Sequence, residues 1–222
     1  MEKYEELKAK LESYKNVWKF IHIYKTGGAS LREAIHPGYF DTPKARDRSG
    51  HFPNHCTVKQ VLRGRGYFGK KATLDTCFFW SSVRNPYDRF LSSYFFMKQH
   101  DAPGNKICPA MMWINANCPD FHTYAKTFST WFPKIIDKNA LWSTQFDCIT
   151  VNGKNALDYM VRFENLAEEW EIIKRLFKAK VPTLGTIHKT KHKPWQEHYS
   201  PELRDIVYNH YKADFELLGY ER

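Results

Sequence analysis

The sequence lacks several features that would place it in a specialised class of protein. Its longest apolar runs, such as Cys77 to Trp80, fall far short of the ~20 residues that a membrane-spanning helix needs. Its five cysteines are an odd number and form no Cys-x-x-Cys pair and no metal-ligand spacing. The first residues show no apolar stretch behind a basic start, so we expect no secretory signal there. These absences predict a reduced, cytoplasmic protein with no membrane span and no metal.

The composition is that of an ordinary globular chain with an excess of positive charge. Of the 222 residues, 42% are hydrophobic and 26% are charged, which excludes a disordered polar chain. No repeat of about 20 to 50 residues and no low-complexity linker divides the sequence, so we expect a single domain over residues 1–222. Lys and Arg number 34 against 24 Asp and Glu, a formal charge of +10. This excess favours anionic partners, whether phosphorylated or sulfated molecules or nucleic acid.

The hydrophobic pattern predicts strands that each lead into a helix. The expected elements, in order, are a helix over 1–16, a strand over 17–23, a helix from Ser30 to Ile35, a short helix after Thr57, a strand over 77–83, a helix to about Gln99, and helices from Glu164 to Lys178 and from Ser200 onward. Strands that feed helices through short turns are typical of an α/β fold with a central parallel sheet flanked by helices.

Two later segments depart from this alternation. Residues 100–120 hold three prolines, one glycine and two cysteines, which predicts an irregular insertion. Residues 121–147 are rich in aromatic side chains and are expected to be helical in pieces. After them, two short apolar runs, 148–151 and 157–163, stand around Asn152-Gly153, which predicts a hairpin-type turn.

The first expected strand runs into Lys25-Thr26-Gly27-Gly28-Ala29-Ser30 and then into a helix. Glycines let a backbone come close to an anion, and the N–H groups of a new helix point toward it. Lys25 adds a positive charge, while Thr26 and Ser30 add hydroxyl donors. The pattern differs from G-x-x-x-x-G-K-[ST], because the lysine precedes the glycines. It predicts a phosphate-binding strand–loop–helix, with a tight turn that merely needs glycine as the alternative.

The second expected strand ends at Arg84, which is followed by Asn85-Pro86 and a helix. Ser92 stands eight positions after Arg84, about two turns into that helix. A guanidinium at a strand end and a hydroxyl on the next helix can hold one phosphate together. A structural ion pair is the alternative for Arg84, and ion pairing that supports the fold is the competing interpretation for Arg89.

Taken in this order, the two motifs resemble those of the sulfotransferase superfamily. The matching stretches are Ile21 to Leu31, Val83 to Ser92, Val161 to Leu166 and, near the C-terminus, Tyr199 to Leu203 with Asp214 to Tyr220. The sequence is most similar to the branch with heparan sulfate 2-O-sulfotransferases and bacterial and viral carbohydrate sulfotransferases. It departs from the family at Tyr24, where proline is common. It also lacks the membrane anchor and luminal disulfides that are usual in eukaryotic members.

This resemblance implies 3′-phosphoadenosine 5′-phosphosulfate (PAPS) as the sulfuryl donor, with no metal. Its 5′-phosphosulfate would bind Lys25, Thr26, Gly27, Gly28, Ala29 and Ser30, and its 3′-phosphate would bind Arg84 and Ser92. The basic run that includes Lys189, Thr190 and Lys191 stands where the family covers the adenine and 3′-phosphate. A solvated basic loop is the alternative interpretation of that run.

The resemblance also implies a histidine base at the start of the helix between the two motifs. His55 matches that position best, and His51, which follows a glycine, is the rival. A histidine with a pKa near neutrality suits the removal of a proton from an attacking hydroxyl.

The sequence therefore predicts an enzyme that moves the sulfuryl group of PAPS to a hydroxyl acceptor, a carbohydrate, by in-line displacement. Residues 39–54 and 100–147 are expected to shape the acceptor side. Three tryptophans of the second segment, Trp113, Trp131 and Trp142, are candidates for stacking on sugar rings, although tryptophans more often belong to a core.

Two other classes of function stay open. An ATP-dependent phosphotransferase of related fold is disfavoured, because the lysine-after-glycine pattern and an acidic metal-binding strand end are both missing. A non-catalytic basic protein that binds nucleic acid would suit the charge, but the sequence carries no recognition motif of that class. We therefore expect no nucleic-acid partner.

Overall fold

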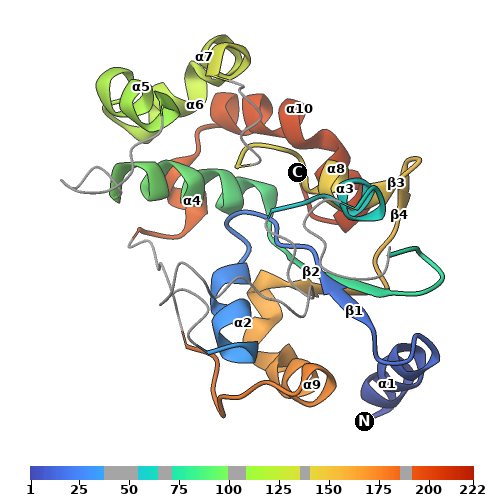
Figure 1. The fold of residues 1–222 in the computed structure, drawn as a ribbon. Coiled ribbons are helices and arrows are strands. Elements are labelled where there is room, and N and C mark those ends of the chain that lie inside the picture. Colours follow the sequence, from blue (N-terminus) through green and yellow to red (C-terminus); the bar gives the residue numbers. More distant parts are fainter. Residues whose placement is uncertain (38–54, 65–71, 100–108, 136–140, 186–191) are drawn as a thin grey trace. The chain divides into compact units, whose positions relative to one another are not determined.

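The structure, a computed structural model, describes residues 1–37, 55–64, 72–99, 109–135, 141–185 and 192–222. The chain divides into two compact units, one of Met1–Arg84 with Gln145–His188 and one of Asn85–Thr144 with Lys189–Arg222. The expected α/β fold is confirmed, since a parallel sheet is flanked by helices (Figure 1). The assignment of residues 1–222 to one domain stays a prediction.

The first unit is built on a parallel sheet in the strand order β1-β2-β5. Strand β1 is Trp18–Phe20, β2 is Phe78–Val83 and β5 is Tyr159–Arg162. Phe20 pairs with Trp80, and Val83 pairs with Arg162, so β2 extends past the end of β1. Every residue of β2 is buried, as expected for a central strand covered on both faces.

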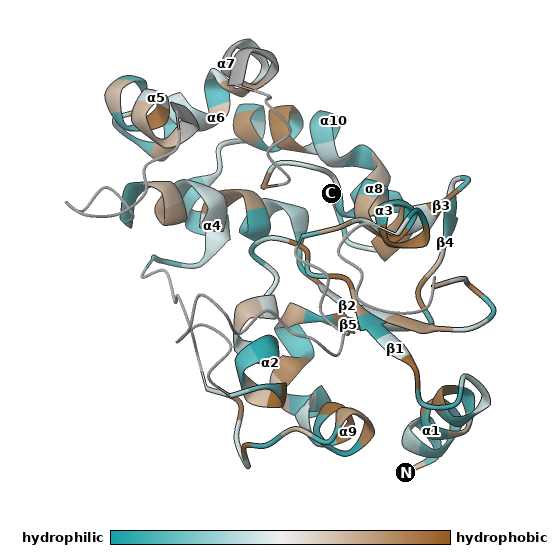
Figure 2. Ribbon diagram, viewed as in Figure 1, coloured by the Kyte–Doolittle hydropathy of each residue, from teal (hydrophilic) through white to brown (hydrophobic). Residues whose placement is uncertain are grey.

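Short helices and one hairpin complete this unit. They are α1 (Glu2–Ser13), α2 (Gly28–Ile35), α3 (Val58–Leu62), α8 (Gln145–Ile149), the hairpin β3 (Thr150–Val151) and β4 (Lys154–Asn155), a 3₁₀ turn η1 (Phe163–Asn165) and α9 (Leu166–Phe177). Alternate strand residues pack against α2 and α9 in one core, where Trp80 stacks on Phe177 with ring centroids 4.1 Å apart. Figure 2 shows hydrophobic residues along α9, whereas α1 is mostly hydrophilic. Burial on one face therefore holds α9 to the sheet.

Three sequence predictions need correction in detail. The expected strand over 17–23 is a strand only over Trp18–Phe20, because the chain then bends into the loop that precedes α2. Residues 159–162 of the second apolar run form β5, which joins the central sheet rather than the hairpin. The predicted turn at Asn152 and Gly153, both at positive φ, is present and joins only the two short strands β3 and β4. In the segment expected to be irregular, Pro109–Asn117 forms helix α5.

The second unit is helical. It contains α4 (Pro86–Gln99), α5, α6 (Phe121–Lys126), α7 (Phe128–Ile135), the 3₁₀ turn η2 (Trp195–His198) and α10 (Pro201–Leu218). Its core is aromatic, and Phe90 of α4 lies against Tyr124 and Phe128 with ring centroids 4.9 and 5.0 Å away. Helix α10 contacts both α4 and α6.

Arg89 of α4 is buried in this unit and connects α4 to residues 141–143 and to α10. Its buried guanidinium donates to the carbonyls of Leu141 and Ser143 at 3.3 and 2.8 Å, and it lies 3.8 Å from the Asp214 carboxylate. Since both members of the ion pair are buried, removing either would leave an uncompensated charge. The structural interpretation of Arg89 is confirmed.

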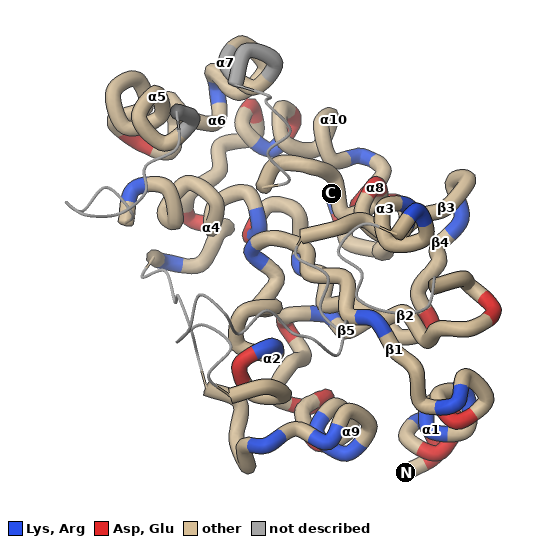
Figure 3. The backbone as a smooth tube through the Cα atoms, viewed as in Figure 1, with Lys and Arg blue, Asp and Glu red and all other residues tan. Residues whose placement is uncertain are grey.

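The charged residues do not gather on one element. Figure 3 shows the described Lys and Arg spread over the helices of both units, with Asp and Glu among them. Within the described ranges, none of the helices has the length and apolar character needed to cross a membrane.

Candidate active site

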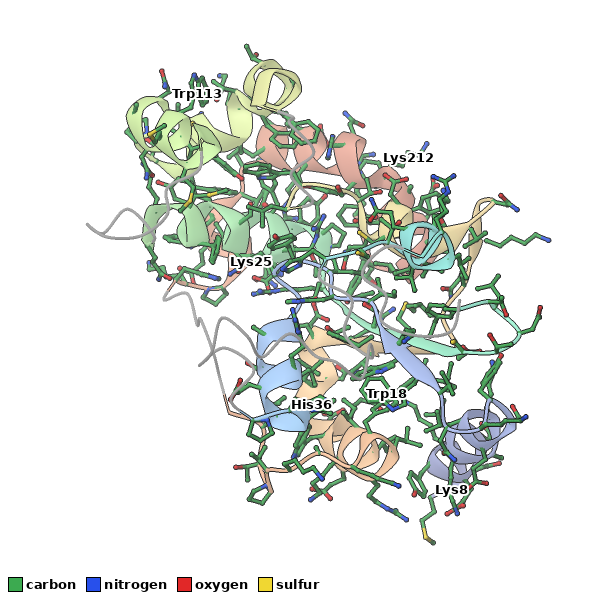
Figure 4. The ribbon with its side chains drawn as sticks, in the orientation of Figure 1. Lys8, Trp18, Lys25, His36, Trp113 and Lys212 are labelled. Carbon is green, nitrogen blue, oxygen red and sulfur yellow. The ribbon has the colours of Figure 1, made fainter. Side chains whose placement is uncertain are left out.

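The loop between β1 and α2 is the candidate anion-binding turn. Helix α2 begins at Gly28, and its N-cap, Gly27, has no side chain to cap the first N–H groups. No acidic residue stands in the first turn of α2, so the positive end of the helix faces the loop without a neutralising side chain of its own. Figure 4 shows Lys25 ahead of this first turn and His36 beyond the other end of α2. The loop therefore combines a cationic side chain with a helix N-terminus.

Both glycines of the loop are required by their surroundings. Gly27 has a φ of 81°, in the left-handed region that other residues rarely adopt. A Cβ at Gly28 would lie 2.2 Å from a carbon of the His22 ring, so only glycine fits there. The tight-turn explanation thus accounts for the glycines by packing alone, and the case for an anion rests on the charged groups around them.

The end of strand β2 braces this loop. Ser81 donates its hydroxyl proton to the carbonyl of Ile21 at 2.6 Å. Thr26 Oγ1 donates to the carbonyl of Ile23 at 2.9 Å and lies 3.1 Å from Ser82 Oγ, which must then be the donor between the two hydroxyls. In this structure the one hydroxyl proton of Thr26 is engaged by the Ile23 carbonyl, and its donation to an anion stays a prediction. The Thr26 backbone N–H is a second candidate donor to an anion.

Arg84 joins the two motifs. Its guanidinium donates to the carbonyl of Lys25 at 3.1 Å and lies over the Phe163 ring, 4.2 Å from the ring centroid. Burial, and then the nearby charge of Arg84, lowers the pKa of Lys25 from 10.5 to about 8. Two cationic groups are thus held together in a largely buried place, where an anion would relieve both desolvation and repulsion.

His55 lies against the same loop. Its ring stacks on the Tyr24 ring, with centroids 3.7 Å apart and planes at 8°, and the His22 ring lies 4.4 Å away. His55 has a φ of 41°, an unusual conformation for a residue other than glycine and one that functional sites often retain. Its Nδ1 is 3.4 Å from the His22 carbonyl, which can only accept, so Nδ1 carries the proton and Nε2 the lone pair.

The electrostatic surroundings keep both histidines neutral. Burial, followed by the charge of Arg32, lowers the pKa of His55 from 6.5 to about 4, although the hydrogen bond to the His22 carbonyl opposes this. Burial, His55 and Arg32 together hold the pKa of His22 well below its usual range. Arg32 donates to Nδ1 of His22 at 2.9 Å, which places the His22 proton on Nε2.

The other predicted residues divide into those that the structure describes and those that it does not. Ala29 and Ser30 lie in the first turn of α2, and Ser92 is buried in α4 of the second unit. His51, Lys189, Thr190 and Lys191 lie outside the described residues. The pairing of Ser92 with Arg84 stays a prediction.

The three tryptophans differ in their surroundings. Trp142 is a core residue, since it is buried and donates to the Tyr124 hydroxyl at 2.6 Å. Trp113, on α5, is 36% exposed. The side chain of Trp131 is not among those described.

Sequence reasoning missed His22, Ser81, Ser82 and Gln145 as parts of this site. Ser81 and Ser82 carried a usable signal, because two serines in an otherwise apolar buried strand need partners. For His22 and Gln145 the sequence carried no such signal.

The model of the sulfotransferase family matches residues 47–221, a span that contains His55, Arg84 and Ser92. This is most of the chain, so the protein belongs to the sulfotransferase family. It is an enzyme of the class that transfers sulfuryl groups from a nucleotide donor to a hydroxyl acceptor. The loop over residues 25–30 precedes the matched span, so its role as the phosphate-binding loop stays a prediction. Searches of curated proteins and of solved structures gave no match to this chain.

Proposed function

We propose that this protein transfers the sulfuryl group of PAPS to a carbohydrate hydroxyl, with His55 as the general base. The observation that carries the proposal is the junction of Lys25 and Arg84. There, the guanidinium of Arg84, at the end of β2, donates a hydrogen bond to the backbone carbonyl of Lys25, in the loop ahead of α2. A donor with phosphates at both the 5′ and the 3′ positions needs two such cationic groups side by side.

The loop residues would hold the 5′-phosphosulfate through the backbone N–H groups from Thr26 to Ser30 and through the Lys25 ammonium. Arg84 would contact the 3′-phosphate, and a single bond to the Lys25 carbonyl is compatible with this because a guanidinium has five N–H donors. Ser92 is the partner that the sequence spacing predicts for this phosphate, and residues 189–191 are predicted to cover the nucleotide. The depressed pKa of Lys25 supports an anionic ligand, since two neighbouring cations gain most from one.

In the proposed reaction, Nε2 of His55 takes the proton from the acceptor hydroxyl while the hydroxyl oxygen attacks sulfur. The new S–O bond forms as the bond from sulfur to the bridging phosphate oxygen breaks, in line with the attack. Lys25 stabilises the negative charge that develops on the departing phosphate. The lone pair on Nε2 is present at neutral pH because the pKa of His55 is about 4.

The carbohydrate acceptor and the 2-O-sulfotransferase-like branch are proposed from the resemblance of the motifs. Trp113, a partly exposed tryptophan, is a candidate for stacking on a sugar. A reducing, cytoplasmic location is supported by Cys56, Cys77, Cys118 and Cys148, which are all buried and form no disulfide with one another.

Thermal stabilisation by adenosine 3′,5′-bisphosphate, compared with ATP plus Mg²⁺, tests the donor. We expect a clear rise in melting temperature with the bisphosphate and little with ATP. The reverse order would favour the phosphotransferase, and stabilisation by any polyanion that vanishes with salt would favour nucleic-acid binding. A screen of carbohydrate acceptors with labelled PAPS then tests the acceptor class, and transfer only to non-carbohydrate hydroxyls would refute that part.

A further inference from the structure

The backbone of Arg84 lies one residue beyond the hydrogen-bonded part of the central sheet. The pairing of β1 with β2 ends at Phe20 and Trp80, and that of β2 with β5 ends at Val83 and Arg162. Arg84 is nevertheless buried, with 8% of its surface exposed. A buried N–H or C=O group without a partner is costly, so the backbone of Arg84 needs a substitute for a neighbouring strand.

Gln145 supplies that substitute. Its Oε1 accepts from the Arg84 N–H at 2.9 Å, and its Nε2 donates to the Arg84 carbonyl at 2.8 Å. Gln145 is the first residue of α8 and is fully buried, so its amide is fixed by the fold. The primary amide presents one acceptor and one donor side by side, as the edge of a strand does.

We propose that Gln145 is a positioning residue that aims Arg84 at the 3′-phosphate of the nucleotide donor. This inference rests on the proposed function, in which Arg84 is the 3′-phosphate ligand. Gln145 fixes the backbone of Arg84, while the Lys25 carbonyl and the Phe163 ring fix its guanidinium. The side chain is therefore held at both ends, and loss of the backbone bonds would leave it held at the guanidinium end only.

The decisive measurement compares two ligands that differ only in the group that Arg84 would contact. Adenosine 3′,5′-bisphosphate and adenosine 5′-phosphate share the 5′ end, so the ratio of their dissociation constants isolates the 3′-phosphate. In Gln145→Glu, the ionised side chain keeps the acceptor but loses the donor to the Arg84 carbonyl. Gln145→Met, of similar volume, loses both bonds and serves as the second variant if the first does not fold.

We expect the parent protein to prefer the bisphosphate and each Gln145 variant to lose about tenfold of that preference, as an interaction energy near 1.4 kcal/mol implies. Affinity for adenosine 5′-phosphate should stay within about twofold, since the loop at α2 is intact. In an Arg84→Ala background, Gln145→Met should change the ratio no further, because the guanidinium that Gln145 positions is then absent.

Gln60→Glu is the matched control. The Gln60 side chain accepts from the Thr57 N–H at 3.0 Å in the cap of α3, and glutamate keeps that acceptor. The ratio for this variant should equal that of the parent.

Three results would overturn the inference: an unchanged ratio in folded Gln145 variants, an equal loss for both ligands, or the same loss without Arg84. A parent protein that shows no preference for the bisphosphate would instead refute the proposed role of Arg84 itself. The failure of the positioning role and the failure of the proposed function are therefore told apart.

Discussion

Binding of adenosine 3′,5′-bisphosphate should draw a proton onto Lys25. In the ligand-free protein, burial and the charge of Arg84 lower the pKa of Lys25 to about 8, so part of the population is neutral in mildly alkaline solution. A phosphate beside the ammonium favours its charged form and raises this pKa again. Binding and protonation are consequently linked, and the number of protons taken up depends on pH in a calculable way.

With a pKa of about 8, Lys25 is about 10% neutral at pH 7, half neutral at pH 8 and about 90% neutral at pH 9. Proton uptake on binding should therefore rise from about 0.1 to 0.5 and then 0.9 across these values. Above pH 8 the affinity should fall toward tenfold per pH unit. At pH 8 and above, phosphate groups, with a pKa near 6, are almost fully ionised, and His55 is already neutral, so neither masks the effect there.

Titration calorimetry at pH 8.5 in two buffers with different ionisation enthalpies counts the protons directly. Lys25→Met should bind more weakly and take up none, whereas Lys174→Met, on α9, should behave as the parent. Uptake that is absent in the parent, or that persists in Lys25→Met, would refute the assignment of Lys25 to the phosphate site.

The same pKa has a consequence for stability. A pKa lowered from 10.5 to about 8 means that the fold disfavours the charged form by roughly 3 kcal/mol. Between these two values the unfolded chain binds more protons, so this group's contribution to stability rises with pH across that window and is least favourable below pH 8. Lys25→Met should accordingly raise the free energy of unfolding of the ligand-free protein at pH 7 by up to about 3 kcal/mol, as measured by denaturant titration.

Three further predictions concern the base, the arginine and a glycine. His55→Ala should lower kcat about 10²- to 10⁴-fold with nearly unchanged affinity for the bisphosphate, and it should abolish the rise of kcat/KM through about pH 4. If His51→Ala does this instead, the two histidines exchange roles. Arg84→Ala should lose roughly 2–4 kcal/mol of bisphosphate affinity by calorimetry, and unchanged binding would remove it from the site. Gly28→Ala should displace the His22 ring and lower the melting temperature, and an unaltered melting curve would contradict the close approach.

The sequence predicted best those features that depend on neighbours a few residues apart. The short helix expected after Thr57 is one case, since Thr57 and Gln60 exchange the two hydrogen bonds of a capping box at its start. The start of α10 is another, where Ser200 Oγ accepts from the Leu203 N–H. Such contacts are fixed by helix geometry alone, so residue type and spacing suffice to predict them.

Contacts between distant parts of the chain were beyond this reasoning. The amide of Gln145 meets the backbone of Arg84 only because the sheet edge and α8 come together in the fold. Likewise, the low pKa of His55 follows from its burial and from the nearby charge of Arg32 in α2. The sequence suggested an ordinary pKa near 6.5. Residue type identified the candidates, and the tertiary surroundings decided their protonation.

The loop ahead of α2 is poorly suited to a purely structural role. It holds Lys25 at a φ of 66°, and it places that lysine close to Arg84 in a largely buried position. The neighbouring His55 adds a second residue in a left-handed conformation. Each of these features costs stability in the absence of a ligand, and such costs tend to gather where a site is preorganised for binding or chemistry. A dianion at the N-terminus of α2 would offset the repulsion between the two cations without any change in the backbone. These features support the proposed role of the loop as a preformed site for the phosphosulfate end of a nucleotide.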